Sequence, residues 1–358
     1  MKLLPRQEQG FTGTWLYNIT VNGGAISDAL ALLRSLRIRP TFLAPEDLAA
    51  GALENRGFKA LILAYNKAMS DAEAHAIRRF VQNGGLVIAD NEPGSYSRFG
   101  KKLDRSRLSD LFPVLDREHL VQYGKGAAVY MPHTINGYLA RFEKCDYAGS
   151  DSVALLLRKY AEVKTPIELI DGRGRPRRDT LMPVYLKGSA RLFGLIRADT
   201  SAGKEVEDTT VKLDRAYHVW DVRESKYLGF IDSFKLSLDM YPKLFAMLPA
   251  NPTRTILRAT GPTVKQGGQL DLEGEIGFEG GQALAIDRLN QVAHVEVIGP
   301  DGKELEHYRD NILFDGRRFR VTLLISYSEE PGLYVIRVRH ALTGMEAQAN
   351  IRVRETDK

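Results

Sequence analysis

The sequence contains a single cysteine, Cys145, among its 358 residues. One cysteine excludes an intrachain disulfide and any metal site that needs several thiolates. No apolar run approaches the roughly 18 residues of a membrane-spanning helix, so we expect no membrane span. The first residues, MKLLPRQEQG, lack the apolar stretch of a secretory signal peptide. For the chain as given, the compartment stays open, with the cytoplasm as the default expectation.

Histidines are few and scattered, which bears on metal and cofactor chemistry. Seven occur between His75 and His340, and no H-E-x-x-H or comparable ligand spacing links them. We therefore expect neither a zinc hydrolase nor a bound cofactor. The net charge of +5 is modest for this length, and no Lys/Arg face stands out, so we expect no nucleic-acid partner.

What the chain does contain is an ordinary globular composition. With 44% hydrophobic residues, 358 positions predict two or three domains. The clearest stretch is Phe58–Glu92, where two apolar runs, Ala60–Ala64 and Leu86–Ala89, each have the length of a strand. A strand, a helix and a strand in this length require a right-handed crossover and hence a parallel pair. A parallel pair is covered on both faces, which predicts an α/β layer.

The helix between these two runs has a predicted start and a predicted end. Ser70 is placed to cap the first turn, and Glu73 completes a capping box. Gly84 and Gly85 predict its end, because glycine adopts the left-handed conformation at low cost. We expect Ile77 and its apolar neighbours at helical spacing to face the sheet.

The motifs of this stretch resemble a glutamine-amidotransferase-like domain. They are S-D-A-E at Ser70–Glu73 and F-V-Q-N-G-G at Phe80–Gly85. In particular, the stretch looks like the version in family forty-two β-galactosidases and related bacterial glycoside hydrolases, known there as the trimerisation domain. The resemblance implies a flavodoxin-like domain that contacts its own copies or a partner (β/α)₈ barrel, to which the catalytic glutamates of that family belong.

The same alternation of strands and helices extends to both sides. We predict strands at Thr14–Val21, Pro40–Leu43 and Gly126–Met131, and helices at Ile26–Leu36 and Ser150–Tyr160. This order favours a doubly wound, flavodoxin-like parallel sheet for residues 1–164.

After residue 164 the pattern changes to period two, which predicts a small antiparallel β-domain over residues 165–250. The predicted strands are Ile167–Ile170, Leu181–Leu186, Arg191–Ala198, Ala216–Asp221 and Leu244–Leu248. Three sequence motifs resemble the β-module that follows the amidotransferase-like domain in such glycosidase-like proteins. They are A-Y-H-V-W-D-V-R at Ala216–Arg223, K-Y-L-G at Lys226–Gly229 and K-L-F-A-M-L-P at Lys243–Pro249.

The last part of the chain predicts an immunoglobulin-like sandwich. Asn251–Thr253, with its proline, is expected to be a linker and a protease-sensitive joint. Residues 254–354 contain roughly seven short alternating segments, typical of such a sandwich. The turns Gly299–Lys303 and Pro331–Val335 resemble bacterial Ig-like and fibronectin-type domains. No Cys…Trp…Cys core is present, so a disulfide-free variety is expected.

Chemistry in an open α/β sheet is expected beyond the carboxyl ends of its strands. Tyr65 and Asn66 follow one predicted strand there, and Asp90, Asn91 and Glu92 follow the next. Class I amidotransferases need a cysteine on a G-x-C-x-G elbow and a His-x-Glu pair, because a positioned base activates the thiol. Both motifs are absent, and the only cysteine lies in R-F-E-K-C-D-Y. We therefore expect no amidotransfer.

Asp90 and Glu92 are candidates for the carboxylate pair that glycoside hydrolysis requires. The alternative is that they cap the loop that follows them. His133, after another predicted strand, is a candidate base or ligand, with a hydrogen-bonded loop histidine as the alternative.

Two further groups of residues have both a functional and a structural interpretation. The basic run Arg173–Arg178 could hold phosphate, or it could be a solvated hairpin loop. Four aromatic residues could stack on sugar faces or pack in the core. They are Trp15, Tyr17, Tyr65 and Tyr96.

The sequence as a whole predicts a non-catalytic accessory protein, related to the C-terminal half of β-galactosidase-like hydrolases and associated with carbohydrate. A homo-oligomer or a separate catalytic-barrel subunit is the expected partner. One alternative is a glycoside-hydrolase-related hydrolase with an altered site at Asp90 and Glu92. The other is a module that binds glycan or protein.

Overall fold

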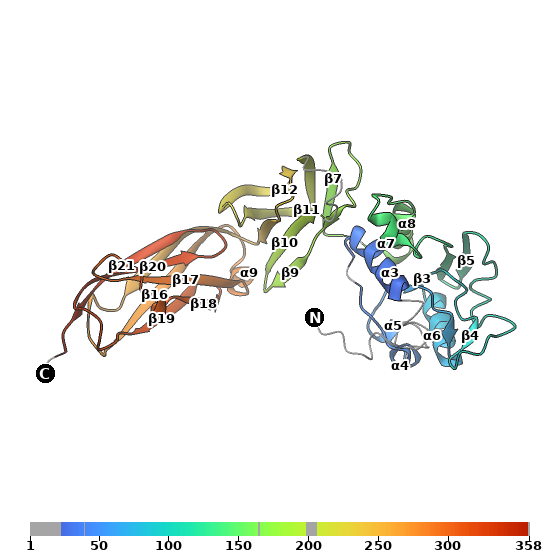
Figure 1. Cartoon of the computed structure of the whole chain (residues 1–358), viewed down its shortest axis with the longest axis horizontal. Helices are drawn as coiled ribbons and strands as arrows, with labels where there is room; N and C mark the ends of the chain where they lie inside the picture. Colours follow the sequence, from blue (N-terminus) through green and yellow to red (C-terminus); the bar gives the residue numbers. More distant parts are fainter. Residues whose placement is uncertain (1–22, 39, 164, 198–205, 357–358) are drawn as a thin grey trace. The chain divides into compact units, whose positions relative to one another are not determined.

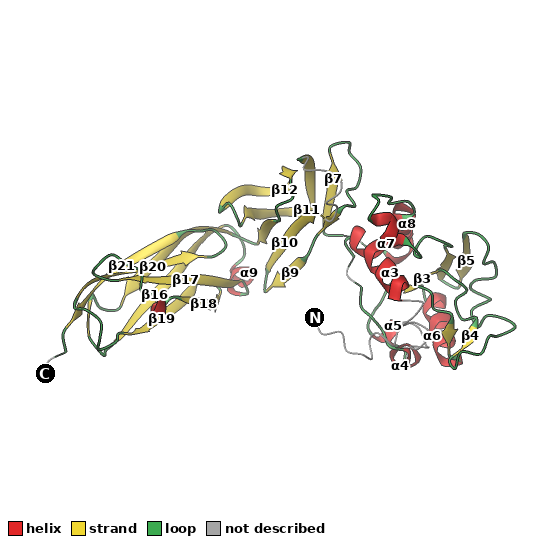
Figure 2. Cartoon of the chain, in the orientation of Figure 1, coloured by secondary structure: helices red, strands yellow, loops and turns green. Residues whose placement is uncertain are grey.

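The computed structural model describes residues 23–38, 40–163, 165–197 and 206–356. These residues group into two compact units. The first comprises the described residues up to Pro166 together with Pro176–Leu181, and the second comprises the remaining ones (Figure 1). Helices are concentrated in the first unit, whereas the second is built almost wholly of strands (Figure 2).

The first unit is an α/β layer around a four-stranded sheet. Its strands follow the order β1-β3-β6-β5, in which β1, β3 and β6 are parallel and β5 is antiparallel to β6. The elements are α3 (Gly23–Ser35), α4 (Pro45–Ala49), α5 (Ala52–Asn55), β1 (Ala60–Leu63), β2 (Ala68–Met69), α6 (Asp71–Gln82), β3 (Leu86–Ala89), β4 (Tyr96–Ser97), β5 (His119–Tyr123), β6 (Gly126–Tyr130), α7 (Tyr138–Phe142), α8 (Ser150–Ala161) and β8 (Thr180–Leu181).

Helix α6 forms as its motifs predict. Ser70 Oγ accepts a hydrogen bond from the Glu73 N–H at 3.2 Å, and Glu73 Oε2 accepts one from the Ser70 N–H at 2.7 Å. At the other end Gly84 has a φ of +112°, the left-handed region that favours glycine. A Cβ on Gly85 would lie 2.4 Å from the Phe80 ring, so the second glycine is needed for close packing. The predicted helix and parallel strand pair are confirmed.

Two hydrophobic cores cover the two faces of this sheet. Side chains of α4, α5 and α6, among them Leu53 and Ile77, form the core with one face. Leu32 of α3, Tyr138 of α7 and Leu157 of α8 lie in the core on the other face. Helices on both faces explain why the strands need continuous apolar sequences.

Three features of the first unit differ from the sequence prediction or lie beyond it. Pro40–Leu43 forms no strand, so that prediction is wrong. The predicted strand Thr14–Val21 lies outside the described residues. Strand β5 and helix α7 have no counterpart in the prediction, because neither has a clear period or cap in the sequence.

The second unit begins with an antiparallel sheet in which β12, β11, β13, β10 and β9 are successive neighbours and β7 pairs with β11. Its strands are β7 (Ile167–Asp171), β9 (Val184–Lys187), β10 (Ala190–Arg197), β11 (Glu207–Asp221), β12 (Lys226–Leu238) and β13 (Lys243–Leu248). Phe193, Val219 and Phe245 are among the residues of its core.

The rest of this unit is a pair of sheets around one core, which includes Leu272, Val295 and Tyr334. One sheet has the order β14-β16-β19 and the other β15-β21-β20-β17-β18. The elements are β14 (Asn251–Ala259), β15 (Thr263–Lys265), β16 (Gln269–Glu279), α9 (Ala283–Asp287), β17 (Asn290–Ile298), the 3₁₀ turn η1 (Glu306–Tyr308), β18 (Asp310–Asp315), β19 (Arg318–Leu324), β20 (Gly332–His340) and β21 (Glu346–Arg354).

The prediction that Asn251–Thr253 form a linker between these two parts is wrong. Asn251–Thr253 are the first residues of β14 and pair with β16. The Trp220 indole N–H donates to Asn251 Oδ1 at 3.2 Å, and Trp220 shares a buried cluster with Leu248 and Leu289. A cluster that joins both parts replaces the soft joint that the proline suggested.

Candidate functional site

The candidate site is the edge of the first sheet where β1, β3 and β6 end. Three loops meet there: residues 64–67 after β1, residues 90–95 after β3 and residues 131–136 after β6. Because the three strands are parallel and adjacent, their carboxyl ends share one edge. The structure therefore brings the sequence candidates from three separate stretches to one place.

Asp90 is the residue that connects these loops. Its side chain is 1% exposed. One carboxylate oxygen accepts the Tyr65 N–H at 2.9 Å and the other accepts the Asn136 N–H at 2.9 Å. The carboxylate of the central loop thus fixes the loops on both sides, and sequence alone does not indicate a partner as distant as Asn136.

Burial raises the pKa of Asp90, and the backbone N–H groups of Tyr65 and Asn136 partly oppose this rise. Nearby Asp28 adds to the rise through repulsion. Asp28 itself accepts the N–H groups of Gly137 at 2.7 Å and Leu139 at 2.9 Å, and so caps α7 from helix α3. The two buried carboxylates hold backbone at this edge together.

Glu92 has a different environment from Asp90. Its carboxylate lies 3.4 Å from the Lys67 ammonium, and its side chain is 46% exposed. The same ammonium lies 4.8 Å from the centre of the Tyr65 ring. The ion pair therefore links the loop after β1 to the loop after β3, and the cation–π contact orients Lys67 within its own loop.

Non-glycine residues in the left-handed region cluster at this edge. Tyr65, Asn91, Glu92 and His133 have φ values of 59°, 52°, 50° and 67°. Each follows one of the three parallel strands. Such conformations cost free energy and persist where surrounding contacts impose them. Four such residues therefore lie in the three loops of this edge.

The buried Tyr130 side chain, at the end of β6, lies beneath this edge. Burial raises the pKa of its phenol, and hydrogen bonds from the backbone of Glu92 and Asn91 act in the opposite direction. Nearby Asp90 and Glu92 raise it further by repulsion. The phenol is thus a neutral hydrogen-bonding group for the loop after β3.

The remaining sequence candidates are placed as follows. His133 is exposed, and its backbone carbonyl accepts a hydrogen bond from Arg141 at 3.0 Å. Cys145 is exposed and follows helix α7, not a strand, so it occupies no nucleophile elbow. Within the described residues, no group of three His, Cys, Asp or Glu side chains could hold a metal ion.

Aromatic candidates for sugar stacking are divided. Tyr65 is half-buried beside Lys67. Asn66 is 9% exposed, and Tyr96 is half-buried in β4, which pairs with β2. Trp15 and Tyr17 lie outside the described residues. Tyr65 and Tyr96 are thus both only partly exposed.

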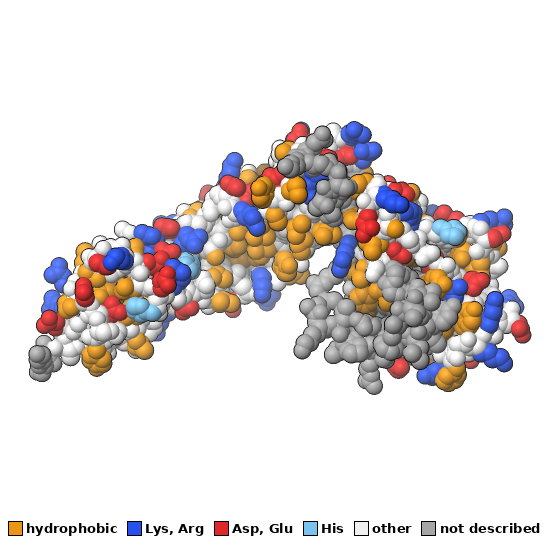
Figure 3. Space-filling view, in the orientation of Figure 1, with side chains coloured by type: hydrophobic (Ala, Val, Ile, Leu, Met, Phe, Trp, Pro, Cys, Tyr) orange, Lys and Arg blue, Asp and Glu red, His pale blue; other side chains and the backbone are white. Residues whose placement is uncertain are grey.

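The basic run Arg173–Arg178 is a loop, as predicted, between β7 and β8. Three of its arginines have local partners: Arg175 pairs with Asp171 at 3.1 Å, Arg177 with Asp179 at 2.8 Å, and Arg178 with Asp151. On the face drawn in Figure 3, basic and acidic side chains are interspersed over the surface. Neutralised arginines are poor phosphate ligands, which favours the structural interpretation of this run.

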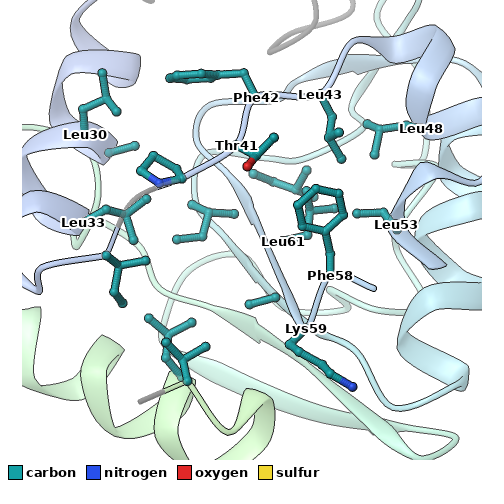
Figure 4. Close-up of a pocket in the computed structure, with 18 of the residues that line it drawn as sticks. Leu30, Leu33, Thr41, Phe42, Leu43, Leu48, Leu53, Phe58, Lys59 and Leu61 are labelled. Atoms are coloured by element: carbon teal, nitrogen blue, oxygen red, sulfur yellow. The ribbon is translucent and has the colours of Figure 1, made fainter. Parts of the chain in front are cut away.

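An apolar pocket of about 350 Å³ lies beside β1. Figure 4 shows Leu30 and Leu33 of α3 on one wall and Leu53 and Phe58 on the opposite wall. Ligand pockets combine an apolar lining with a few convergent polar groups. Here the polar side chains of the lining are Thr41, Lys59 and Asn66, so the pocket offers little that would orient a polar ligand.

None of the described helices is long and apolar enough to cross a membrane.

Comparison with known proteins finds similarity among solved structures. No protein-family model matches the sequence, and no curated protein matches it. A β-galactosidase from Bacillus circulans sp. alkalophilus is 10% identical, with a TM-score of 0.44 over 64% of this chain and 38% of that chain. A catalytic mutant of Gan42B, a GH42 β-galactosidase from G. stearothermophilus, is 13% identical, with a TM-score of 0.44 over 62% of this chain and 36% of that chain.

A GH42 exo-carrageenase from Bacteroides ovatus is 16% identical, with a TM-score of 0.37 over 62% of this chain and 26% of that chain. The chain therefore spans well under half the length of each of these enzymes.

Proposed function

We propose that this chain is a non-catalytic accessory or assembly protein, related to the C-terminal half of β-galactosidase-like glycoside hydrolases and associated with carbohydrate. The observation that carries the proposal is the state of Asp90. Both of its carboxylate oxygens accept backbone N–H groups, and the side chain is buried. A carboxylate used in this way is a structural tie, and it leaves Glu92 without the second carboxylate that glycoside cleavage requires.

The proposal includes a finer division of the fold. Residues 1–164 would be a flavodoxin-like, glutamine-amidotransferase-like domain, residues 165–250 a small antiparallel β-domain, and residues 254–354 an Ig-like sandwich. The parallel order β1-β3-β6 with helices on both faces supports the first assignment. The capping box and double glycine of α6, which carry the resemblance, adopt the geometry that their motifs require.

The expected partner is a second copy of this chain or a separate catalytic-barrel subunit. Both follow from the resemblance of the first domain to a trimerisation domain, and carbohydrate is a further ligand. Light scattering across a concentration series tests self-association through residues 14–164. A strict monomer that also binds no catalytic-barrel protein would contradict the assembly role.

A hydrolase acting at the same edge is the second candidate. Two observations favour it: the left-handed residues at the ends of the parallel strands, and the raised pKa of Asp90. Both are common at active sites because such sites use strain and perturbed acids. In this candidate Glu92 and Asp90 would be the catalytic carboxylates, and His133 would assist as a base.

One experiment separates the two candidates. Purified chain is incubated with nitrophenyl glycosides and with glutamine, with and without divalent metal ions. The accessory role predicts no turnover. The hydrolase would be established instead by turnover that copurifies with the chain and disappears in Glu92→Gln. Glu46→Gln is the control, because Glu46 is an exposed glutamate of α4, and turnover should survive in it. A glycan-array signal without turnover would favour a pure binding module.

A further inference from the structure

Aromatic side chains of β11 and β12 gather on one face of the hairpin that these two neighbouring strands form (Figure 1). In the register of the hairpin, His218 pairs with Phe230 and Trp220 pairs with Tyr227. The ring centroids lie 4.8 Å apart in the first pair and 5.4 Å apart in the second. His218 and Tyr227 lie 6.1 Å apart, so the four rings form one continuous aromatic surface.

A β-bulge brings the two β12 residues of this surface to the same face. Tyr227 and Phe230 are three positions apart, a spacing that places side chains on opposite faces of a regular strand. The register of β12 against β11 shifts between them, which leaves Leu228 as an extra residue, and Gly229 beside it has a φ of +126°. Bulges re-aim side chains and are common next to functional sites. The bulge here adds Tyr227 to the face that carries Phe230.

The rings of this surface differ in their exposure to water. Trp220 is 4% exposed and belongs to a buried cluster, whereas Tyr227 is 36% exposed and Phe230 is 63% exposed. His218 is half-buried between them. Core packing therefore explains Trp220 but not Phe230, whose ring is mostly in contact with water. Grouped apolar side chains that remain exposed in this way are typical of binding sites.

Hydrogen-bonding groups border the exposed rings. His218 Nδ1 lies 2.8 Å from the Tyr227 hydroxyl. The other ring nitrogen, Nε2, faces Gly280, because a Cβ on this glycine would lie 3.4 Å from it. The missing side chain at residue 280 leaves this side of the imidazole uncovered. Glu279 is exposed, and in the part of the chain that the structure describes no hydrogen bond or ion pair engages its carboxylate.

The charge state of these groups suits a neutral ligand. Burial lowers the pKa of His218, and the nearby Glu279 carboxylate opposes this change. Burial raises the pKa of Tyr227, and Glu279 raises it further. The imidazole and the phenol are thus uncharged near neutral pH. Depending on the tautomer, Nε2 either donates or accepts a hydrogen bond, and a hydroxyl group can match both.

We propose that His218, Tyr227, Phe230 and Glu279 form a binding site for a neutral hexopyranose unit of a glycan. The C–H bonds on one face of such a sugar ring stack on the exposed Phe230 ring. Hydroxyl groups at the edge of the sugar donate to the Glu279 carboxylate and bond to His218 Nε2. Apolar surface with a few placed polar groups is the usual composition of ligand sites. The proposal deepens the carbohydrate association proposed above and rests on it.

Two other ligands fit this surface less well. A cation is attracted by aromatic faces and by a carboxylate, but it binds best where several ring faces surround it. Here the Trp220 ring is buried and Phe230 alone is mostly exposed, so the surface is a platform and not a cage. An acidic or sulfated sugar would be repelled by the unpaired charge of Glu279. A flat, uncharged ring with hydroxyl groups at its edge matches all of the groups present.

The first test is an NMR titration of the full chain labelled in its histidine rings. The probes are the methyl glycosides of glucose, galactose and mannose, and His218→Gln assigns the signal. We expect at least one probe to shift the His218 signal and to leave that of His307 unchanged, because His307 is exposed but lies in η1. If none of the three shifts the His218 signal, the proposal is wrong.

Substitution of Phe230 tests the stacking. Phe230→Ala is expected to weaken binding of the sugar by about tenfold, and Phe230→Tyr is expected to retain it, because both aromatic rings offer a face. Phe99→Ala is the matched control, since it removes a phenylalanine of the first unit that is 86% exposed. Phe230 is exposed, so its loss should leave the fold intact. Equal affinities of Phe230→Ala and the parent chain would overturn the proposal.

Substitution of Glu279 tests the polar edge. Glu279→Gln is expected to weaken binding several-fold, because it replaces a charged acceptor by a neutral one. Glu306→Gln, at an exposed glutamate of η1, should bind as the parent chain does. Tetramethylammonium is the probe for a cation site. Shifts of the His218 signal by this ion, with none by the three glycosides, would assign the surface to a cation and refute the sugar site.

These results are separable from the test of the accessory role. Light scattering reports self-association, and the titration reports sugar binding at the hairpin. A chain that self-associates but binds none of the glycosides would lose this site and keep the assembly role. A strict monomer that binds a glycoside through Phe230 would keep the site and lose that role.

Discussion

A buried histidine at the end of β20 makes the stability of the second unit depend on pH. His340 is 0% exposed; its Nδ1 lies 2.8 Å from Thr343 Oγ1, and among the described residues Nε2 has no hydrogen-bond partner. Burial lowers the pKa of His340 from 6.5 to about 4. The fold therefore holds a neutral imidazole at a place where a charge would be poorly solvated.

The sign follows from proton binding in the two states. The unfolded chain protonates this histidine near pH 6.5, whereas the folded chain does so only near pH 4. Between these values the unfolded state binds more protons, so stability is full above pH 6.5 and falls as the pH decreases to 4. Since one pKa unit is worth about 1.4 kcal/mol, this group costs about 3 kcal/mol across the interval.

The assay is urea unfolding at a series of pH values, followed by the fluorescence of Trp220 in a Trp15→Phe background. Trp220 is a suitable probe because Leu342 and Met345, on either side of Thr343, pack against its buried cluster. His340→Gln removes the titrating group, so the loss of unfolding free energy on acidification is expected to shrink by about 3 kcal/mol. His307→Gln, at an exposed position, should show the same loss as the parent chain. An undiminished loss in His340→Gln, or an NMR titration of His340 near its ordinary pKa, would refute the reasoning.

Three substitutions in the first unit test its local contacts by chemical denaturation. Gly85→Ala places a Cβ against the Phe80 ring and should cost about 1–3 kcal/mol; a neutral result would show that the ring moves aside at no cost. Asp90→Asn leaves at least one buried backbone N–H without an acceptor, so we expect the unfolding free energy to fall by about 1–3 kcal/mol. A stability equal to that of the parent chain would contradict this role of Asp90. Ser70→Ala removes the acceptor for the Glu73 N–H and should cost about 1 kcal/mol of unfolding free energy. Asp71→Asn, at an exposed neighbouring position, leaves the capping hydrogen bonds in place. Equal stabilities of Ser70→Ala and the parent chain would argue against the cap.

The sequence predicts the parts of the fold that are set by local chemistry. Helix α6 is specified by Ser70, Glu73 and Gly84, which all act within a few residues of themselves, and it forms where they indicate. Strand β12 shows the limit of such reasoning. A bulge near Trp220 interrupts the pairing of β11 with β12, and none of the five strands predicted for this part of the chain covers β12.

For the candidate site, the sequence predicts that several side chains share one sheet edge, and it leaves open what each of them does. Parallel strands bring Tyr65, Asp90 and Glu92 to one edge, as their places after the predicted strands require. The function of Asp90 depends on Asn136, which lies far away in the sequence and is brought close by the loop after β6. Residue type alone shows a carboxylate; only the tertiary contacts show that it secures backbone.

The cluster around Trp220 has a consequence for how this protein could change during evolution. Trp220 and Leu248 belong to the antiparallel sheet, and Leu289 and Met345 belong to the two-sheet part, yet all pack together. Separating the two parts would expose this apolar surface on both and strand the Asn251 side chain that accepts the indole N–H. Recombination between genes would therefore preserve the segment from Ile167 to Arg354 as one heritable piece. Exchange of a single sheet for an unrelated one would require a new surface on its neighbour at the same time.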